Sequence, residues 1–222
     1  MRDSYVNIPG YGYNKLNAAY AYGGADLLMD TIEENFYVRI DDYIAVNFIS
    51  FAAIVDSIGG IDMKVTADEA QEINTILMAE VNEIMGDAVD SDLLDAKDGK
   101  VHLSGKQALS YARIRHIGNA DFQRTERQRE VVSKVVDKVK SFNVSALMNL
   151  ASTAVPQLTT NMSKGQLYLL SLRLPFVIGN DIKQLRIPAE NTYSGADTDV
   201  GSVLQIDFDA NYKLIRDSVF AD

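Results

Sequence analysis

The chain has 222 residues, long enough for one domain with a full hydrophobic core, and its 47% hydrophobic and 23% charged residues are typical of a globular protein. It has no cysteine and only two histidines, which excludes disulfides, thiolate catalysis and the usual zinc sites. The net charge of −10 argues against general nucleic-acid binding, because that function relies on a basic surface.

The first third of the chain alternates strands and helices. We expect a strand over residues 3–8, closed by Pro9 and Gly10, then a small-residue helix that stops at Gly23 and Gly24 and a second helix over residues 25–35. Further strands are predicted at residues 43–48 and 61–65, with a buried helix at 48–57 between them. A strand, a helix and a strand in this order indicate a right-handed crossover and an α/β sheet.

The remaining elements are read from caps, turns and periodicity. Residues 67–100 are expected to form a mixed helical and acidic segment. Its final acidic run, DAVDSDLLDAKDGK at 87–100, is expected to be a solvated insertion, since its spacing does not match a calcium-binding loop. A helix with Ser104 as its N-cap is expected to run to residue 115. The later predictions are helices near residues 144–158, 163–174 and 209–220, and strands at 182–187 and 202–206.

Five of the ten arginines fall within residues 113–129 of this acidic chain. From residue 123 onward the apolar spacing predicts one helix, in which Arg124, Arg127 and Gln128 share a face with the core valines Val131 and Val135. Charges on a core-facing stripe are costly unless they are paired or face a polar cavity, and the N-terminal end of a helix attracts anions. This end of the helix is therefore suited to an anion.

Two interpretations of this cluster stay open on the residues alone. Arg113 and Arg115 close the preceding helix, and Asp121 lies between the two arginine pairs, so the group fits a structural salt-bridge network as well as an anion site. Lys15 similarly fits a solvated lysine at a helix start, the reading favoured on spacing, or a phosphate ligand.

Three stretches taken together resemble the LytR-CpsA-Psr family of bacterial cell-wall glycopolymer transferases. They are RDSYVNIPGYGYNKLNAAYAYGG at residues 2–24, DDYIAVNFISFAAIVDSIGGIDMKV at 41–65 and LSGKQALSYARIRHIGNADFQRTERQREVV at 103–132. The third matches the family's L-x-G-x-x-A-L-x-Y-x-R-x-R, D-x-x-R and R-Q signature in order and spacing. The expected fold is α/β, a three-layer αβα sandwich with a central mixed sheet flanked by helices, and residues 1–222 form a single domain of this family.

The resemblance implies a phosphotransferase that moves a glycopolymer, such as wall teichoic acid or capsular polysaccharide, from a polyprenyl-pyrophosphate carrier to peptidoglycan. Two other functions remain as alternatives: a lipid-pyrophosphate phosphatase, or a non-catalytic regulatory module that binds polyprenyl phosphate or polyanions. Phosphoryl transfer needs mainly positioning and charge neutralisation, for which arginines, a cation and a carboxylate are suitable groups. A prenyl tail would also need an apolar slot, which the valine face of the arginine helix and the helix at 48–57 are able to line.

The resemblance also assigns roles to individual residues. Those implied in catalysis are Asp3, Arg113, Asp121 and Arg124. Those implied in binding the pyrophosphate are Arg2, Lys15, Arg115, Arg127 and Gln128. Asp3 is the expected ligand of Mg²⁺, with Mn²⁺ as an alternative ion.

The family resemblance also bears on location and partners. The chain opens with MRDSYVNIPG, as though inside a strand, so we expect an upstream strand with a second acidic residue and an N-terminal membrane anchor. The expected place of action is the extracytoplasmic face of the bacterial cell membrane. The expected partners are a polyprenyl-pyrophosphate-linked glycan, peptidoglycan and the membrane, and not nucleic acid. Gly24 stands where some members of the family carry an arginine.

Overall fold

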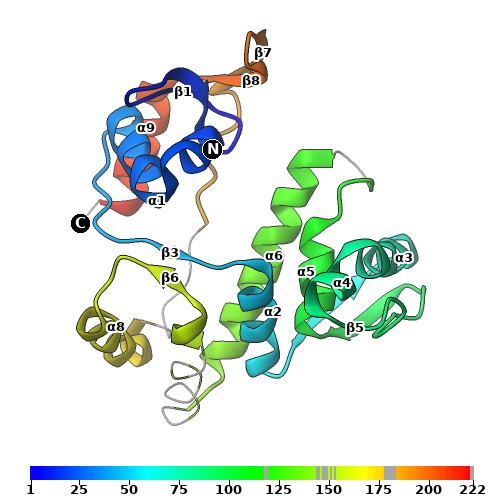
Figure 1. Ribbon diagram of the computed structural model, residues 1–222. Helices are drawn as coiled ribbons and strands as arrows, with labels where there is room; N and C mark the ends of the chain where they lie inside the picture. Colours follow the sequence, from blue (N-terminus) through cyan, green and yellow to red (C-terminus); the bar gives the residue numbers. More distant parts are fainter. Residues whose placement is uncertain are drawn as a thin grey trace. The chain divides into compact units, whose positions relative to one another are not determined.

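The computed structural model describes residues 1–117, 120–143, 146, 150, 152, 154–177 and 184–220, without the side chains of 120–122, 171 and 174–177. Contacts within the chain divide it into two compact units, each of which is described by itself. Unit 1 comprises Met1–Tyr43 and Ile182–Asp222, and unit 2 comprises Ile44–Asp181 (Figure 1). Across the described ranges, no helix has both the length and the apolar character needed to cross a bilayer.

Unit 1 joins the first and last parts of the chain. Its elements are β1 (Tyr5–Ile8), β2 (Gly12–Lys15), α1 (Leu16–Phe36), β7 (Tyr193–Thr198), β8 (Gly201–Ile206) and α9 (Phe208–Val219). β1 and β2 form an antiparallel hairpin, as do β7 and β8. A parallel bridge between Ser4 and Leu204 connects the two hairpins, so the strands of this unit are of mixed direction.

The core of unit 1 follows from the alternation of β1. Val6 and Ile8 point to one side and are fully buried, because successive strand side chains face opposite ways. They pack with Leu16 and Phe36 of α1 and with Ile215 of α9. The predicted interruption of α1 is confirmed, since Gly23 and Gly24 leave the helical conformation inside it and Gly24 has a positive φ of 69°.

Unit 2 contains the remaining elements. They are β3 (Ile44–Ala45), α2 (Phe48–Ser57), β4 (Ile61–Val65), α3 (Ala67–Ile76), the π-helical turn η1 (Leu77–Val81), α4 (Asn82–Met85), β5 (Gly99–Leu103), α5 (Gly105–Arg113), α6 (Ala120–Lys140), the short 3-10 helix η2 (Val155–Gln157), β6 (Thr159–Thr160) and α8 (Lys164–Val177). The bounds of α2 and β4 are those predicted, and Ser104 caps α5 through a capping box. The helix predicted at 163–174 is present as α8, which a capping box of Ser163 and Gln166 opens.

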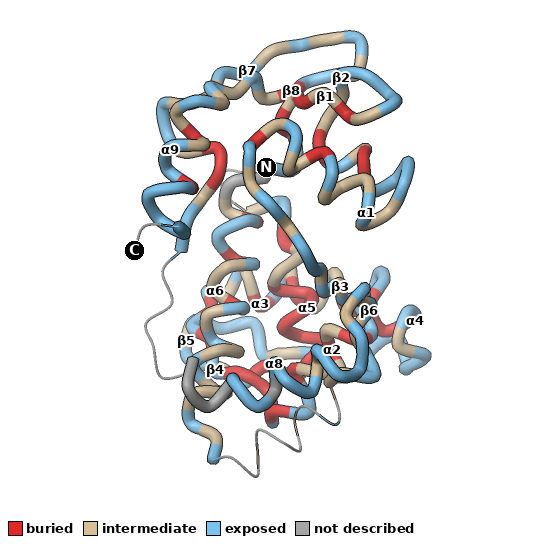
Figure 2. Tube along the Cα trace, turned by 90° about the vertical axis from the view of Figure 1, so that its left-hand side faces the viewer, coloured by how far each residue is buried: buried red, intermediate tan, exposed pale blue. Residues whose placement is uncertain are grey.

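The helical part expected within residues 67–100 is present as α3, η1 and α4, and the acidic run at 87–100 is largely exposed, as expected for a solvated insertion. Ala70, Ile73, Leu77 and Val81 are fully buried in the core of unit 2. Figure 2 colours the buried positions of the chain red. The spacing of these four residues is that of a helical stripe, which α3 continues through η1. The acidic loop that follows is also attached: Lys106 Nζ, itself nearly buried, lies 2.6 Å from Asp87 and 2.9 Å from Asp92, and these carboxylates raise the pKa of Lys106 against the opposing effect of its burial, the largest single influence.

The predicted crossover between the strands around α2 does not appear in the described residues. β3 pairs with β6 and β4 pairs with β5, in both cases antiparallel. β5 pairs antiparallel with β4 although α3, η1 and α4 lie between the two strands in the chain. Among the described residues the strands of unit 2 are therefore short antiparallel pairs with helices packed on them, which keeps the α/β class. Of the helix predicted near residues 144–158, the described positions 146, 150, 152 and 154 are helical and η2 follows them, while 144–145, 147–149, 151 and 153 lie outside the described residues. The start of the predicted strand at 182–187 also lies outside them, and residues 184–187 are not in a strand.

α5 approaches α2 unusually closely at Gly105. A Cβ atom added there would lie 2.0 Å from the backbone oxygen of Ala52, so only glycine fits. The amide of Gly105 also donates a hydrogen bond of 2.6 Å to Asp56 Oδ1 near the end of α2. This close packing sets the position of α5, whose last residue is Arg113, against the first turn of α2.

Candidate functional site

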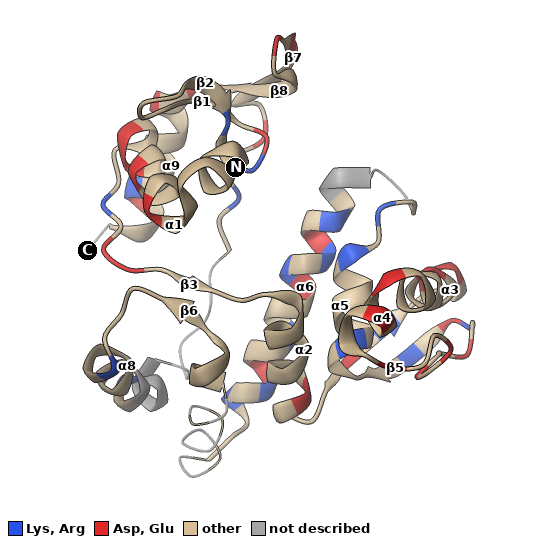
Figure 3. Ribbon diagram, viewed as in Figure 1, with Lys and Arg blue, Asp and Glu red and all other residues tan. Residues whose placement is uncertain are grey.

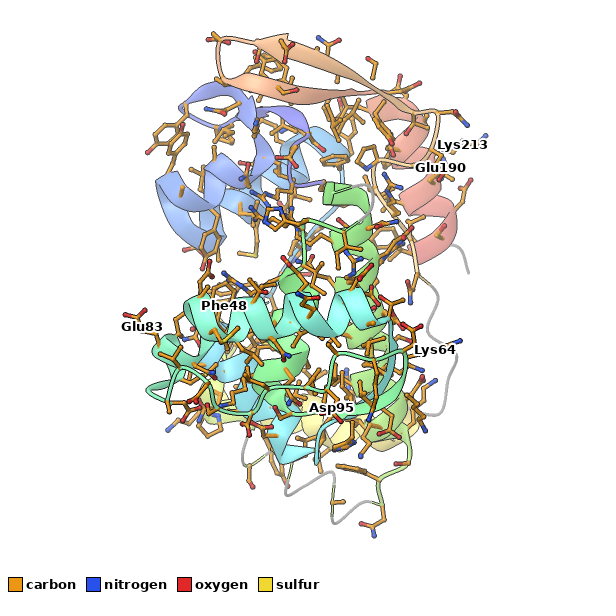
Figure 4. The ribbon with its side chains drawn as sticks, turned by 90° about the vertical axis from the view of Figure 1, so that its right-hand side faces the viewer. Phe48, Lys64, Glu83, Asp95, Glu190 and Lys213 are labelled. Carbon is orange, nitrogen blue, oxygen red and sulfur yellow. The ribbon has the colours of Figure 1, made fainter. Side chains whose placement is uncertain are left out.

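Arg113 ends α5 and lies against α2. Its guanidinium carbon is 4.4 Å from the centre of the Phe48 ring, which is cation–π geometry. Phe48 is labelled in Figure 4, among the side chains of unit 2. The Nη2 atom of Arg113 pairs with Glu80 of η1, while its Nε atom is buried without a hydrogen-bond partner. A buried donor without a partner is costly, so this end of the guanidinium is suited to an incoming acceptor.

The first turns of α6 bury two further arginines, as the sequence predicted for its core-facing stripe. Arg124 and Arg127 are each only 6% exposed, and Val131 continues the same face into the core. Arg127 Nε lies 3.1 Å from Glu69 Oε1, and both terminal nitrogens contact the carbonyl of Ile117 at 3.4–3.5 Å. Figure 3 shows basic bands at the start of α6 and the end of α5. A buried ion pair of this kind holds the guanidinium in place.

An apolar cavity lies between α2, α5 and α6. Its volume is about 220 Å³, and most of its lining is apolar. The lining residues are Val46, Asn47, Phe48, Phe51, Leu109, Ala112, Arg113, Gln128, Val131 and Val132. The predicted slot between the valine face of α6 and α2 is therefore present, with one guanidinium and one amide among its walls. Such a cavity fits a ligand with an apolar chain and an anionic end.

The other predicted residues of unit 2 take different positions. Gln128 is exposed, lines the cavity and donates from Nε2 to the carbonyl of Ala112 at 3.4 Å. Arg115 is exposed in the segment after α5. The side chain of Asp121 lies outside the described residues, although its backbone is in α6. The structure thus brings Arg113 and Gln128 to one cavity and buries Arg124 and Arg127 on the adjoining helix.

The remaining predicted residues belong to unit 1. Arg2 Nε lies 3.9 Å from Asp3 Oδ1, and both side chains are partly exposed. The carbonyl of Asp3 accepts a hydrogen bond from the Leu204 amide at 2.8 Å, which fixes the backbone of Asp3 beside β8. Lys15 ends β2 and immediately precedes α1.

The donors of unit 1 suit Mg²⁺ only if water and substrate phosphates supply the rest of the ion's ligands. Across the described residues no group of three or more histidine, cysteine or carboxylate side chains is arranged to hold a metal. Mg²⁺, however, often takes only one or two protein carboxylates and completes its shell with water and substrate phosphates. Asp3, with a partly exposed carboxylate, fits that smaller role.

The partners of the arginines were not identified from the sequence. Glu69 and Glu80 both come from the α3–η1 segment, and π-helical turns such as η1 are frequent at functional sites. The signal available for Glu69 was its capping box with Thr66, which marks a helix start.

Tyr111 donates a hydrogen bond of 2.8 Å to Glu130. Burial is the larger cause and this hydrogen bond the next that raise the pKa of Tyr111, so its phenol stays neutral.

The fold and the cavity define an α/β protein that presents arginine to an apolar cavity, a combination suited to an amphiphilic anion. The chain belongs to the LytR_cpsA_psr family, whose profile matches residues 1–212. The family predicted from the three sequence stretches is therefore confirmed.

Three curated relatives align with the whole chain or with about three quarters of it. The Regulatory protein MsrR of Staphylococcus aureus is 31% identical over the whole chain, which spans 63% of MsrR. The polyisoprenyl-teichoic acid–peptidoglycan teichoic acid transferases TagU of Enterococcus faecalis and TagT of Bacillus subtilis are 38% and 34% identical, each over 73% of the chain. The chain spans about half of their length, 48% and 47%.

A solved structure of TagT bound to LI-WTA has the same fold. It superposes with a TM-score of 0.69 at 26% identity, covering 99% of this chain and 77% of that chain. Together with the helices and strands described above, this similarity confirms the predicted α/β fold class.

Proposed function

We propose that this protein is a phosphotransferase that moves a teichoic-acid-type or capsular glycopolymer from a polyprenyl-pyrophosphate carrier to peptidoglycan. The observation that carries the proposal is the apolar cavity with Arg113 in its wall. A polyprenyl diphosphate complements both features, because its apolar chain suits the lining and its anionic head suits the guanidinium. Support also comes from the relatives TagU and TagT, which are named as teichoic acid transferases.

In this proposal a hydroxyl oxygen of peptidoglycan attacks the phosphorus that carries the glycan. The bond from that phosphorus to the bridging oxygen breaks, polyprenyl monophosphate leaves, and the hydroxyl proton is taken up by a carboxylate or water. The product is a phosphodiester between glycan and peptidoglycan. Such a reaction needs groups that hold the diphosphate and neutralise its charge more than it needs covalent catalysis.

Arginine suits this task better than lysine. Its planar guanidinium binds two phosphate oxygens at once, and it keeps its charge when buried. Arg113 is held by Glu80 and Phe48 with its Nε free of partners, so its position is fixed before substrate arrives. Arg127 is fixed by Glu69. Groups positioned in advance need no reorganisation as negative charge moves onto the leaving phosphate.

The other sequence-predicted residues keep their proposed roles. Arg124 and Asp121 would be catalytic, and Arg115 and Gln128 of unit 2 and Arg2 and Lys15 of unit 1 would bind the pyrophosphate. Asp3 would supply one ligand to Mg²⁺ or Mn²⁺. When bound, the ion would neutralise part of the charge on the diphosphate. The reaction would take place at the extracytoplasmic face of the bacterial membrane, where carrier lipid and peptidoglycan meet.

The test is transfer by the purified chain from a polyprenyl-pyrophosphate-linked glycan to peptidoglycan, compared with Arg124→Ala. The variant is expected to lose transfer, whereas Lys134→Ala, which removes an exposed cation from the same helix, should keep it. Near wild-type turnover by Arg124→Ala would contradict the proposal.

A reaction without peptidoglycan separates the alternatives. Release of polyprenyl monophosphate that does not depend on peptidoglycan would identify a phosphatase. Retained affinity for polyprenyl phosphate without any Mg²⁺-dependent product would identify a binding module, the kind of role that the name of MsrR suggests.

A further inference from the structure

The apolar cavity of unit 2 opens between exposed apolar side chains. Its inner wall is buried, with Leu109 and Val131 only 5% and 1% exposed. Its outer wall is open to water, since Val46, Phe48 and Val132 are 48%, 46% and 58% exposed. The lining therefore passes from a buried floor to an apolar mouth at the surface of the unit.

The first turn of α2 extends this mouth beyond the cavity itself. Ile49 follows Phe48 in α2, is 52% exposed and is not one of the lining residues. Successive residues of a helix lie 100° apart, so Ile49 projects beside Phe48 rather than behind it. The Phe48 ring is held in place by the Arg113 guanidinium, 4.4 Å from its centre. Together Val46, Phe48, Ile49 and Val132 form what we call the rim of the cavity.

Negative charge is absent from the rim, although 31 of the 222 residues of the chain are Asp or Glu. None of the residues that line the cavity is a carboxylate, and residues 43–55 contain none either. On α6, Glu126 and Glu130 lie about 120° and 160° around the helix from Val132, so they face away from the mouth. Arg115, two residues after the end of α5, adds an exposed positive charge.

An apolar rim with positive charge beside it suits the surface of a bilayer that contains anionic lipids. Large apolar groups enter the boundary between headgroups and acyl chains, and a nearby arginine is attracted to anionic headgroups. The cavity favours the same occupant, because the carrier proposed as its ligand is itself a bilayer lipid. A prenyl chain that crossed water to reach the cavity would expose each of its apolar groups, and a mouth resting on the bilayer removes that exposure.

We propose that the rim of Val46, Phe48, Ile49 and Val132 docks on a bilayer that contains anionic lipids, so that a carrier lipid enters the cavity directly from the leaflet. The identity of that lipid rests on the proposed function, whereas the contact itself depends only on the rim. Docking of this kind gives unit 2 a membrane contact of its own, separate from the expected N-terminal anchor.

The test is co-sedimentation of the full 222-residue chain with vesicles of phosphatidylcholine and phosphatidylglycerol that hold no carrier lipid. Ile49→Glu places a charge on the rim without changing the cavity lining, and Ile49→Leu keeps the rim apolar. The matched control is Ile84→Glu, the same change at a 41% exposed isoleucine of α4. Thermal melts confirm that each variant folds.

The wild type, Ile49→Leu and Ile84→Glu are expected to bind the mixed vesicles alike. Ile49→Glu should bind about tenfold more weakly, because it loses an apolar contact and is repelled by the anionic headgroups. Vesicles of phosphatidylcholine alone should bind the wild type about fivefold more weakly.

Three results would overturn the proposal. They are no vesicle binding by the folded wild type, equal losses in Ile49→Glu and Ile84→Glu, and equal binding to both kinds of vesicle. A wild-type dimer that binds no vesicles and that Ile49→Glu dissociates is one form of the first result, and it would assign the rim to a second copy of the chain.

A transfer assay separates this inference from the proposed function. With the donor embedded in vesicles, Ile49→Glu should transfer more slowly than Ile84→Glu, while with a short-chain donor dissolved in water both should match the wild type. No transfer by the wild type from the dissolved donor would be a failure of the proposed function. Normal transfer from the dissolved donor, with equal rates for the two variants on vesicles, would be a failure of the docking surface alone.

Discussion

Glu69→Gln tests whether the buried Arg127 is held for a ligand or only for stability. In the wild type Arg127 Nε is 3.1 Å from Glu69 Oε1, and the side chains are 8% and 14% exposed. Glutamine keeps the size of the side chain. It also keeps the capping contact that Glu69 Oε2 makes with the Thr66 amide, since glutamine serves at that position of a capping box. The substitution therefore removes the charge and little else.

The expected cost follows from burial. Removing one partner of a buried ion pair costs about 3–5 kcal/mol because the other charge is left without compensation. The lower value of about 3 kcal/mol applies here, since Glu69 retains some contact with water and Arg127 keeps the carbonyl of Ile117. For a chain of this size, 3 kcal/mol corresponds to a fall in Tm of roughly 6–12 °C.

Pyrophosphate binding distinguishes the two interpretations. If Arg127 binds the diphosphate, Glu69 competes for the same guanidinium, and Glu69→Gln should bind pyrophosphate about three- to tenfold more tightly, within the usual range of coupling energies. The assay is thermal unfolding with and without pyrophosphate, because a ligand at 100 times its Kd stabilises by about 2.7 kcal/mol. The control is Glu126→Gln, the same change at an exposed position of α6.

Each outcome has a defined meaning. A lower Tm with tighter pyrophosphate binding supports a functional Arg127. A lower Tm with unchanged pyrophosphate affinity would show that the pair serves stability alone. An unchanged Tm would refute the reasoning about the buried charge itself.

Four further changes have expected results. Arg113→Lys keeps the charge but loses the planar stack, so transfer should fall about tenfold, and an unchanged rate would contradict the role of the guanidinium. Val132→Phe, at an exposed wall of the cavity, should weaken polyprenyl diphosphate binding in a titration and leave inorganic pyrophosphate binding and Tm unchanged. Gly105→Ala should destabilise by about 3 kcal/mol in urea unfolding, because the new Cβ meets the oxygen of Ala52; a normal midpoint would refute the close approach. The raised pKa of Tyr111 stabilises the folded state fully below about pH 10, the usual pKa of tyrosine, and this contribution is lost as the pH rises through the folded-state pKa. Because Tyr111 ionises at a raised pH in the folded chain, Tyr111→Phe should remove a late step from an alkaline absorbance titration.

Local signals in the sequence predicted local structure well. The bounds of α2 and β4 follow from an apolar run with a glycine stop, and the interruption of α1 follows from the Gly23–Gly24 pair. The burial of Arg124 and Arg127 follows from helical periodicity, because both fall on the same face as Val131.

What could not be predicted depends on contacts between distant residues. Glu69 and Arg127 are 58 positions apart, and nothing local to either one identifies the other as its partner. The many acidic residues after position 67 give no indication of the buried stripe of Ala70, Ile73 and Leu77, which packs against distant parts of unit 2. Strand pairing is also a long-range property: β4 turns back on β5 rather than joining β3.

The most direct measurement of the central claim is a crystal structure of the chain with a short polyprenyl diphosphate. The account predicts the prenyl chain inside the cavity walled by Phe48, Val131 and Val132, with the diphosphate in contact with Arg113. A diphosphate bound away from Arg113, with the cavity still empty of lipid, would contradict it.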